Sequence, residues 1–190
     1  MSMATLRREG LWEVNSRTIV YAAIGAALYG VLGALISIVI PGSNNVTVRP
    51  AYALVPFFGI AFGPIVGFFT GLVGNALLDQ ITGYGAFTAW NWSIANGLAG
   101  LVAGLFAASM SDRLRSPSGR IIGAAFIAAA ATVIGFLFVF TDIWLGTADN
   151  FSVALSDNYI PVVISNVIVA GILTPILVAA WEPMRAQMGR

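Results

Sequence analysis

The sequence predicts an all-α integral membrane protein with six transmembrane helices and both termini in the cytoplasm. Of its 190 residues, 58% are hydrophobic and 9% are charged, and the mean hydropathy is +0.89. A soluble domain carries about a quarter charged residues, so this composition excludes one. Five long stretches hold no charged residue: 18–48, 50–78, 80–111, 121–141 and 158–181. About 20 apolar residues cross a bilayer as a helix, so each stretch can hold a span.

The stretch 50–78 decides between five spans and six, because glycines and a proline interrupt it between Gly59 and Gly67. It can form one kinked helix or a tight hairpin of two shorter helices. A single crossing would place the arginine-rich loop 110–120 opposite the N-terminus, against the positive-inside rule. A double crossing leaves eight of the nine arginines on one side and only Arg49 on the other. The hairpin, and with it six spans, is the better interpretation.

The expected spans, in chain order, are 17–39, 50–62, 64–81, 91–110, 120–141 and 158–180. The membrane domain is then 17–180, preceded by a cytoplasmic segment at 1–16 and followed by a cytoplasmic tail at 181–190. The first residues lack a small-residue cleavage site after a short apolar core, so they are interpreted as a cytoplasmic lead-in. The long connections, 40–50, 82–90 and 142–157, all fall on the outer side, where a ligand site is expected.

Small residues recur every fourth position in two of the spans. Ala22, Ala26 and Gly30 stack on one face of the first span, and glycines from Gly59 to Gly71 do the same in the hairpin. Small residues let helices approach closely in lipid. The glycine series is expected to pack inside the bundle. The first-span series can either pack there or form a smooth face on which a partner helix docks.

Polar and aromatic residues gather in the outer halves of the later spans and in the outer loops. Polar groups at membrane depth are costly and are typical of functional sites. The alternatives are ordinary ones: interhelical hydrogen bonds for the asparagines, an interfacial belt for the tryptophans and snorkelling for the arginine. The candidate substrate-binding residues are Asn45, Arg49, Tyr52, Asn75, Asp79, Tyr84, Trp90, Trp92, Asn96, Asn158 and Asn166.

The missing residue types exclude several activities. With no cysteine and no histidine, the chain has no disulfide, no thiolate or imidazole metal site and no Ser-His-Asp triad. We expect no metal, no cofactor and no enzymatic activity. A net charge of +1 argues against nucleic-acid binding. No phosphate-binding loop and no inverted repeat is found that would drive transport by this chain alone.

Four segments resemble one family of membrane proteins: AYA at 51–53, FGPIVGF at 62–68, GNALLD at 74–79 and WNWSIANG at 90–97. They are similar to the substrate-binding S components of energy-coupling factor (ECF) transporters, in particular the riboflavin-type subgroup. The resemblance implies a multi-pass subunit of the bacterial plasma membrane that captures a vitamin from outside. It also implies a coupling membrane subunit and two cytoplasmic ATPase subunits as partners. Ala22 and Ala26 match the family's Ala-xxx-Ala motif for the coupling subunit, and Gly30 on the same face is a further candidate contact.

The leading hypothesis is therefore an S component for riboflavin or a similar flat heteroaromatic molecule. Aromatic residues of the outer loops can stack on such a ring, and neutral amides can bind its edge. Cobalamin and thiamine are the alternative vitamins, the latter through Asp79. Two other classes remain open, namely a membrane enzyme with Asp79 as its base and an assembly subunit without a ligand.

Overall fold

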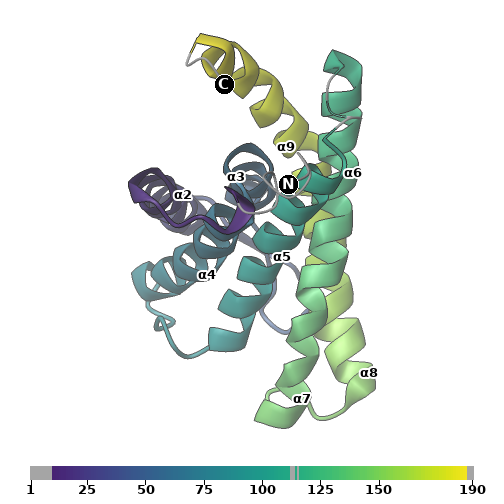
Figure 1. The fold of residues 1–190 in the computed structure, drawn as a ribbon. Coiled ribbons are helices and arrows are strands. Elements are labelled where there is room, and N and C mark those ends of the chain that lie inside the picture. The colour runs from purple at the N-terminus through teal and green to yellow at the C-terminus, as the bar shows by residue number, and fades with distance from the viewer. Residues whose placement is uncertain (1–9, 112–113, 115, 188–190) are drawn as a thin grey trace.

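The computed structural model describes residues 10–111, 114 and 116–187 (Figure 1). Five helices in this part of the chain are long and apolar enough to span a membrane: Ser16–Leu35, Pro64–Ile81, Trp90–Ser109, Ser118–Leu145 and Phe151–Met184. A shorter apolar helix, Pro50–Phe62, stands where the second span is expected. It is roughly 20 Å long and falls short of the hydrocarbon thickness. The predicted helical membrane protein is confirmed, with five helices of spanning length and one short helix.

The first long helix, α2 (Ser16–Leu35), has a well-defined start and ends earlier than expected. The Asn15 side chain accepts a hydrogen bond from the Thr18 backbone N–H at 3.1 Å, and Thr18 reaches back to the Asn15 N–H. This reciprocal pair is a capping box, which satisfies free N–H groups of the first turn. The span was expected to continue to residue 39, but the chain becomes extended at Ile36. A short turn of 3-10 helix, η1 (Gly10–Trp12), precedes α2.

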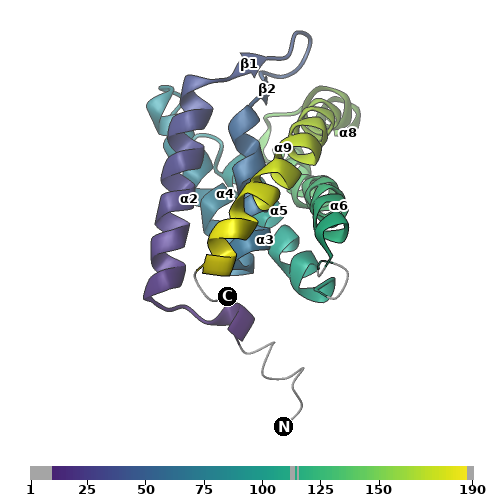
Figure 2. The ribbon, with the colours of Figure 1, turned by 90° about the horizontal axis from the view of Figure 1, so that it is seen from above.

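A two-stranded antiparallel hairpin follows α2, which an all-α prediction did not include. Strand β1 (Ile38–Val39) pairs with β2 (Thr47–Val48). So short a hairpin is marginal alone. It is held to the rest of the bundle by the Asn44 N–H, which donates to the Asp157 carbonyl at 3.1 Å. The hairpin lies at the opposite end of α2 from η1 (Figure 2).

The interrupted stretch forms two helices, as the hairpin interpretation predicts. A 3-10 turn, η2 (Pro50–Ala53), leads into α3 (Leu54–Phe62), and α4 (Pro64–Ile81) starts after one residue. That residue is Gly63, with φ +105°, a conformation that side chains rarely adopt. Pro64 then occupies the first position of α4, where its missing N–H costs nothing. Helix α3 contacts α2, α4, α5, α6 and α9 and lies at the centre of the bundle.

The last spans are longer than expected. Helix α5 (Trp90–Ser109) matches its prediction, whereas α6 (Pro117–Gly135) continues through a 3-10 stretch, Phe136–Thr141, into α7 (Asp142–Leu145). The predicted loop 142–157 is mostly helical. It contains α8 (Phe151–Val153) and a π-helical stretch, Ala154–Tyr159, that runs into α9 (Ile160–Gln187). The helix therefore passes the expected end of the last span at residue 180.

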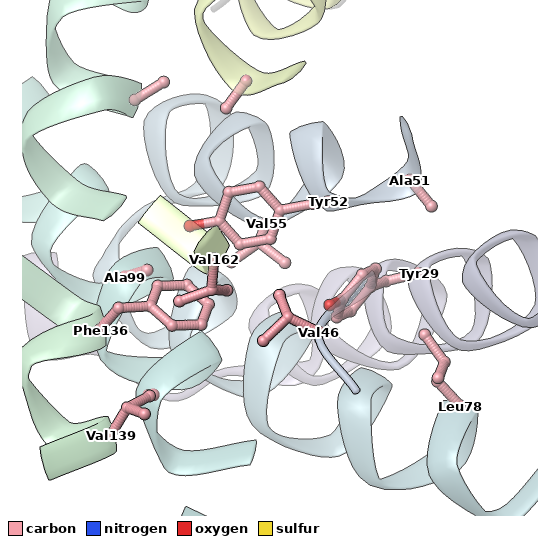
Figure 3. Close-up of a cluster of buried hydrophobic side chains, with 13 residues drawn as sticks. Tyr29, Val46, Ala51, Tyr52, Val55, Leu78, Ala99, Phe136, Val139 and Val162 are labelled. Carbon is pink, nitrogen blue, oxygen red and sulfur yellow. The ribbon is translucent and has the colours of Figure 1, made fainter. Parts of the chain in front are cut away.

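Helices α4 and α5 approach each other through glycines. A Cβ atom added to Gly67 would collide with the Gly100 carbonyl, and one added to Gly100 would collide with the Gly67 carbonyl. The expected internal packing of the glycine series is thus confirmed for Gly67. The largest buried cluster lies beside this contact and includes Tyr52 among Val55, Val162 and Phe136 (Figure 3).

Candidate ligand-binding site

A cavity of about 650 Å³ lies between the β hairpin, the loop 82–89 and the adjoining ends of the long helices. It brings together residues from α2, α4, α5, α7 and α9 that are far apart in the chain. Nine of the eleven expected site residues line it: Asn45, Arg49, Asn75, Asp79, Tyr84, Trp90, Trp92, Asn96 and Asn166. The long connections on which the site was expected do meet at this cavity.

Two expected site residues do not line the cavity. Tyr52 is buried in the apolar cluster, and its hydroxyl lies 2.9 Å from the Thr132 hydroxyl. Asn158 is also fully buried and donates to Asp142 at 2.8 Å. The structure therefore does not bring these two side chains to the cavity with the other nine. Both lie just behind the cavity wall and support it.

Asn75 is the centre of a polar cluster at the buried end of the cavity. Its Oδ1 accepts from Arg49 at 3.3 Å, Asn96 at 3.4 Å and the Tyr29 hydroxyl at 3.5 Å. Its Nδ2 donates to Asp79 Oδ2 at 2.9 Å and to the Ser93 hydroxyl at 3.1 Å. A guanidinium can only donate and a carboxylate can only accept, so these two neighbours determine which way the amide faces.

Asn96 and Tyr29 complete this cluster. The Tyr29 hydroxyl donates to Asn96 Oδ1 at 2.9 Å, and Asn96 Nδ2 donates to the Trp92 carbonyl at 2.9 Å. Tyr29 comes from α2 and was not among the expected residues, because nothing in its local sequence distinguishes it from a core tyrosine. Its hydroxyl ties α2 to α4 and α5 at the cavity floor.

A second polar cluster surrounds Asp142, which is almost fully buried. Its carboxylate accepts from Asn91 at 2.7 Å and from the Trp92 indole N–H at 3.0 Å. It also accepts from Asn158 at 2.8 Å and from the Thr147 hydroxyl at 3.0 Å. The carboxylate thus links α5, α7, the following loop and the π-helical stretch. It lines the cavity and was missed as a site residue.

The aromatic residues divide into those at the cavity and those outside it. Trp92 and Phe136 line it and contact each other edge to face at 6.4 Å, and Tyr84 and Trp90 lie at its margin. Phe87 and Trp144 do not line it, and both are more than four-fifths exposed. Fewer aromatic side chains are therefore available to stack on a ligand than the number in the predicted outer loops indicated.

Among the buried residues at the cavity, one amide makes no hydrogen bond to any residue that the structure describes. It belongs to Asn166 of α9, which is buried except where it faces the cavity. Arg49 has its Nε buried without a partner and forms no ion pair with a described carboxylate. Both side chains can therefore form new hydrogen bonds with a ligand. The described residues contain no group of three metal-ligating side chains.

The small-residue face of α2 is used inside the bundle. Ala26 is buried, and a Cβ on Gly30 would lie 2.9 Å from Leu77 Cβ of α4. Ala22 is partly buried against an aromatic cluster. Of the two alternatives for this face, the structure favours internal packing, because Ala26 and Gly30 are buried and Gly30 lies against α4. The exposed small residues of α2 are one position further along, at Ala23 and Ala27.

Fold and cavity define a class: a helical membrane protein whose polar, partly aromatic cavity is suited to a small molecule. The chain belongs to the S component family of ECF-type riboflavin transporters, whose family model matches residues 13–182. The resemblance seen in the sequence is thereby confirmed. This is a family of transporter subunits, which argues against the membrane-enzyme alternative.

Individual relatives match parts of the chain. A UPF0397 protein of Vibrio atlanticus is 36% identical over 125 residues, which cover 64% of this chain and 67% of the relative. One from Aliivibrio fischeri is 38% identical over 104 residues, 55% of each chain. One from Streptococcus thermophilus is 44% identical over 90 residues, 47% of this chain and 48% of its own. The latter two matches thus span about half of the relatives. No solved structure matches.

Proposed function

We propose that this protein is the substrate-binding subunit of an ECF-type vitamin importer in a bacterial plasma membrane. It captures riboflavin or a similar flat heteroaromatic molecule from outside. A coupling membrane subunit and two cytoplasmic ATPase subunits then provide the energy for uptake. The chain itself has no phosphate-binding loop with which to use ATP.

The cavity is the observation that carries this proposal. It joins an aromatic wall at Trp92 and Phe136 with amide and charged groups at its buried end. Aromatic rings stack on such walls, and a few placed polar groups bind the edge and select the ligand. Apolar packing between helices needs neither a half-buried arginine such as Arg49 nor a buried aspartate such as Asp79, and such charges are expensive at membrane depth.

Size and charge favour riboflavin over the alternative vitamins. A volume of about 650 Å³ lies within the ~300–1,000 Å³ of sites for drug-sized ligands. This suits a three-ring molecule better than a corrin with its nucleotide tail. A cation such as thiamine could pair with Asp79. It would be repelled by Arg49, which contacts the other end of the same Asn75 amide. The opposite charges favour a ligand with no net charge.

The orientation and the partner surface belong to the same proposal. The chain crosses six times with both termini inside, so the cavity opens outward. The coupling subunit docks on the exposed face of α2, where Ala23 and Ala27 permit close approach of a partner helix. Exposed apolar residues such as Ile24 and Leu28 flank them.

Titration of the purified full chain in detergent with riboflavin, cobalamin and thiamine tests the function. Quenching of tryptophan fluorescence reports binding near Trp92. We expect submicromolar binding of riboflavin that weakens about tenfold in Asn166→Ala, because one ligand hydrogen bond is lost. Mass spectrometry of any compound that copurifies with the protein checks the ligand independently.

Phe87→Ala is the matched control, since Phe87 is an outer aromatic residue that does not line the cavity. It should leave the affinity unchanged. If none of the three vitamins binds and no small molecule copurifies, the proposed function is wrong. Tight binding of cobalamin alone would replace riboflavin as the substrate.

A further inference from the structure

Arg49 and Asp79 are opposite charges at the same end of the cavity, and Asn75 separates them. Arg49 donates to the oxygen of the Asn75 amide, and Asp79 accepts from its nitrogen. No ion pair joins Arg49 to Asp79 within the described part of the chain. The Asn75 amide therefore lies between a cationic donor, Arg49, and an anionic acceptor, Asp79, which form no ion pair with each other.

Asn75 itself has no capacity left for a ligand. Its Nδ2 has two hydrogens, and both are used, by Asp79 and Ser93. Its Oδ1 has two lone pairs and already accepts from two donors, Arg49 and Asn96, while the Tyr29 hydroxyl, 3.5 Å away, directs its one hydrogen mainly to Asn96. Asn75 is a positioning residue that holds the two charged side chains in place.

Capacity remains on the two charged residues and on one amide opposite. The Arg49 guanidinium donates through Nη1 to Asn75, and its remaining N–H groups have no acceptor among the described residues. The Asp79 carboxylate uses Oδ2 for Asn75, and no described residue donates to its Oδ1. Asn166 on α9 offers a complete amide from the other side of the cavity. The groups that a ligand would meet are thus a cationic donor beside an anionic acceptor.

We infer that the ligand presents to this end an uncharged cyclic amide edge, a ring C=O beside a ring N–H. The carbonyl accepts from Arg49, the N–H donates to Asp79, and the ring extends toward Trp92. This inference rests on the proposed function and deepens it, because it assigns the polar contacts and the net charge of the substrate.

The opposite charges of Arg49 and Asp79 disfavour a ligand that carries a net charge. An anion would be attracted by Arg49 but repelled by Asp79. A cation would be attracted by Asp79 but repelled by Arg49. A buried charge without full compensation is costly. A neutral donor–acceptor edge satisfies both residues and brings no additional charge into the site. Hydrogen bonds to charged partners are the stronger ones, so two of them at one edge give a specific contact.

Methylation of the edge tests this contact without changing the protein. Riboflavin carries such an N–H between two ring carbonyls, and 3-methylriboflavin has a methyl group there. In the unmodified full chain we expect the methyl compound to bind about 10- to 100-fold more weakly. The comparison uses the same tryptophan quenching and requires no variant that could fail to fold.

The variant Asp79→Asn assigns the effect to its residue. It should weaken riboflavin binding about 10- to 100-fold and reduce the penalty of methylation to a few-fold, since the lost contact is the same one. Asp149→Asn, in the loop before α8, is the control and should keep the full penalty. A purely structural role of Asp79 would lower the affinity for both flavins equally.

Several results would overturn the inference. Equal binding of riboflavin and 3-methylriboflavin would do so, as would a methylation penalty that is unchanged in Asp79→Asn. Tighter binding of thiamine or of a zwitterionic amino acid would also overturn it, and so would a charged compound that copurifies. Equal binding of the two flavins, or an unchanged methylation penalty in Asp79→Asn, would leave the proposed vitamin capture intact. Absence of any ligand would refute the proposed function as well. A different copurifying compound supports the inference if it is uncharged and has the edge.

Discussion

At Asp142 one buried carboxylate accepts hydrogen bonds from the side chains of four residues, two of them on α5. Its sequence neighbours indicated only an outer-side acid before a loop. Its burial depends on Asn91 and Asn158, which the fold brings to it from other elements. Local patterns contain no information about such distant partners, so the sequence predicted four of the cavity's six asparagines but missed the acid that organises its wall.

Replacing Asp142 with asparagine should destabilise the cavity end of the molecule. The amide can accept at its oxygen only, so at least one of the buried donors loses its partner, at about 1–3 kcal/mol each. We expect a lower midpoint of thermal unfolding in detergent and altered tryptophan fluorescence, because the Trp92 indole loses its acceptor. Asp149→Asn should change neither quantity. An unchanged midpoint in Asp142→Asn would contradict the buried network.

At the scale of the element, α2 shows what periodicity can and cannot predict. The four-residue spacing of small residues correctly indicated a face for close helix contact, and Gly30 makes such a contact with α4. The same spacing occurs twice on this helix, once through Ala22 and Ala26 and once through Ala23 and Ala27. A shift of one residue turns the face by about 100°. Which face α4 covers depends on the whole bundle.

The double variant Ala23→Leu, Ala27→Leu tests the exposed face. Added bulk should prevent close approach of the coupling subunit, so uptake and copurification with that subunit should fall. Ligand binding to the isolated chain should persist, since neither residue lines the cavity. Ala179→Leu, at an exposed position of α9, is the matched control. Loss of ligand binding together with uptake would show instead that the face packs within the chain.

The contact between α4 and α5 gives a second prediction at this scale. Gly100→Ala places a methyl group against the Gly67 backbone, which cannot move aside as a flexible side chain can. The helices must separate, and we expect a lower unfolding midpoint and less monodisperse protein. Gly171→Ala in α9 meets nothing within 4 Å and should be neutral or stabilising, by up to about 1 kcal/mol. Equal behaviour of the two variants would contradict the packing.

For the whole molecule, hydrophobic stretches and arginine distribution predicted the helical class and the break at Gly63. They did not predict the β hairpin, which is too short to leave a pattern. The same patterns predicted a loop before α9, although Phe151–Tyr159 is helical. Charges mark where a span can begin, but a helix can continue beyond the membrane wherever its residues permit.

The orientation in the membrane is the last prediction, and it follows from the α3–α4 hairpin. A hairpin returns the chain to the outer side whether or not its tip at Gly63 reaches the inner surface. The loop 82–89 and the turn after α7 then lie outside, and the start of α6 lies inside. A single crossing would invert all three positions.

Single cysteines distinguish these arrangements directly, because the chain has none of its own. Phe87→Cys lies in the loop 82–89 and Trp144→Cys at the end of α7, both at highly exposed positions, and Ser118→Cys is exposed at the start of α6. In intact cells a membrane-impermeant maleimide should label the first two and not the third. After permeabilisation all three should react, which controls for accessibility. Labelling of Ser118→Cys in intact cells, with protection of the other two, would contradict the six-span arrangement with both termini inside.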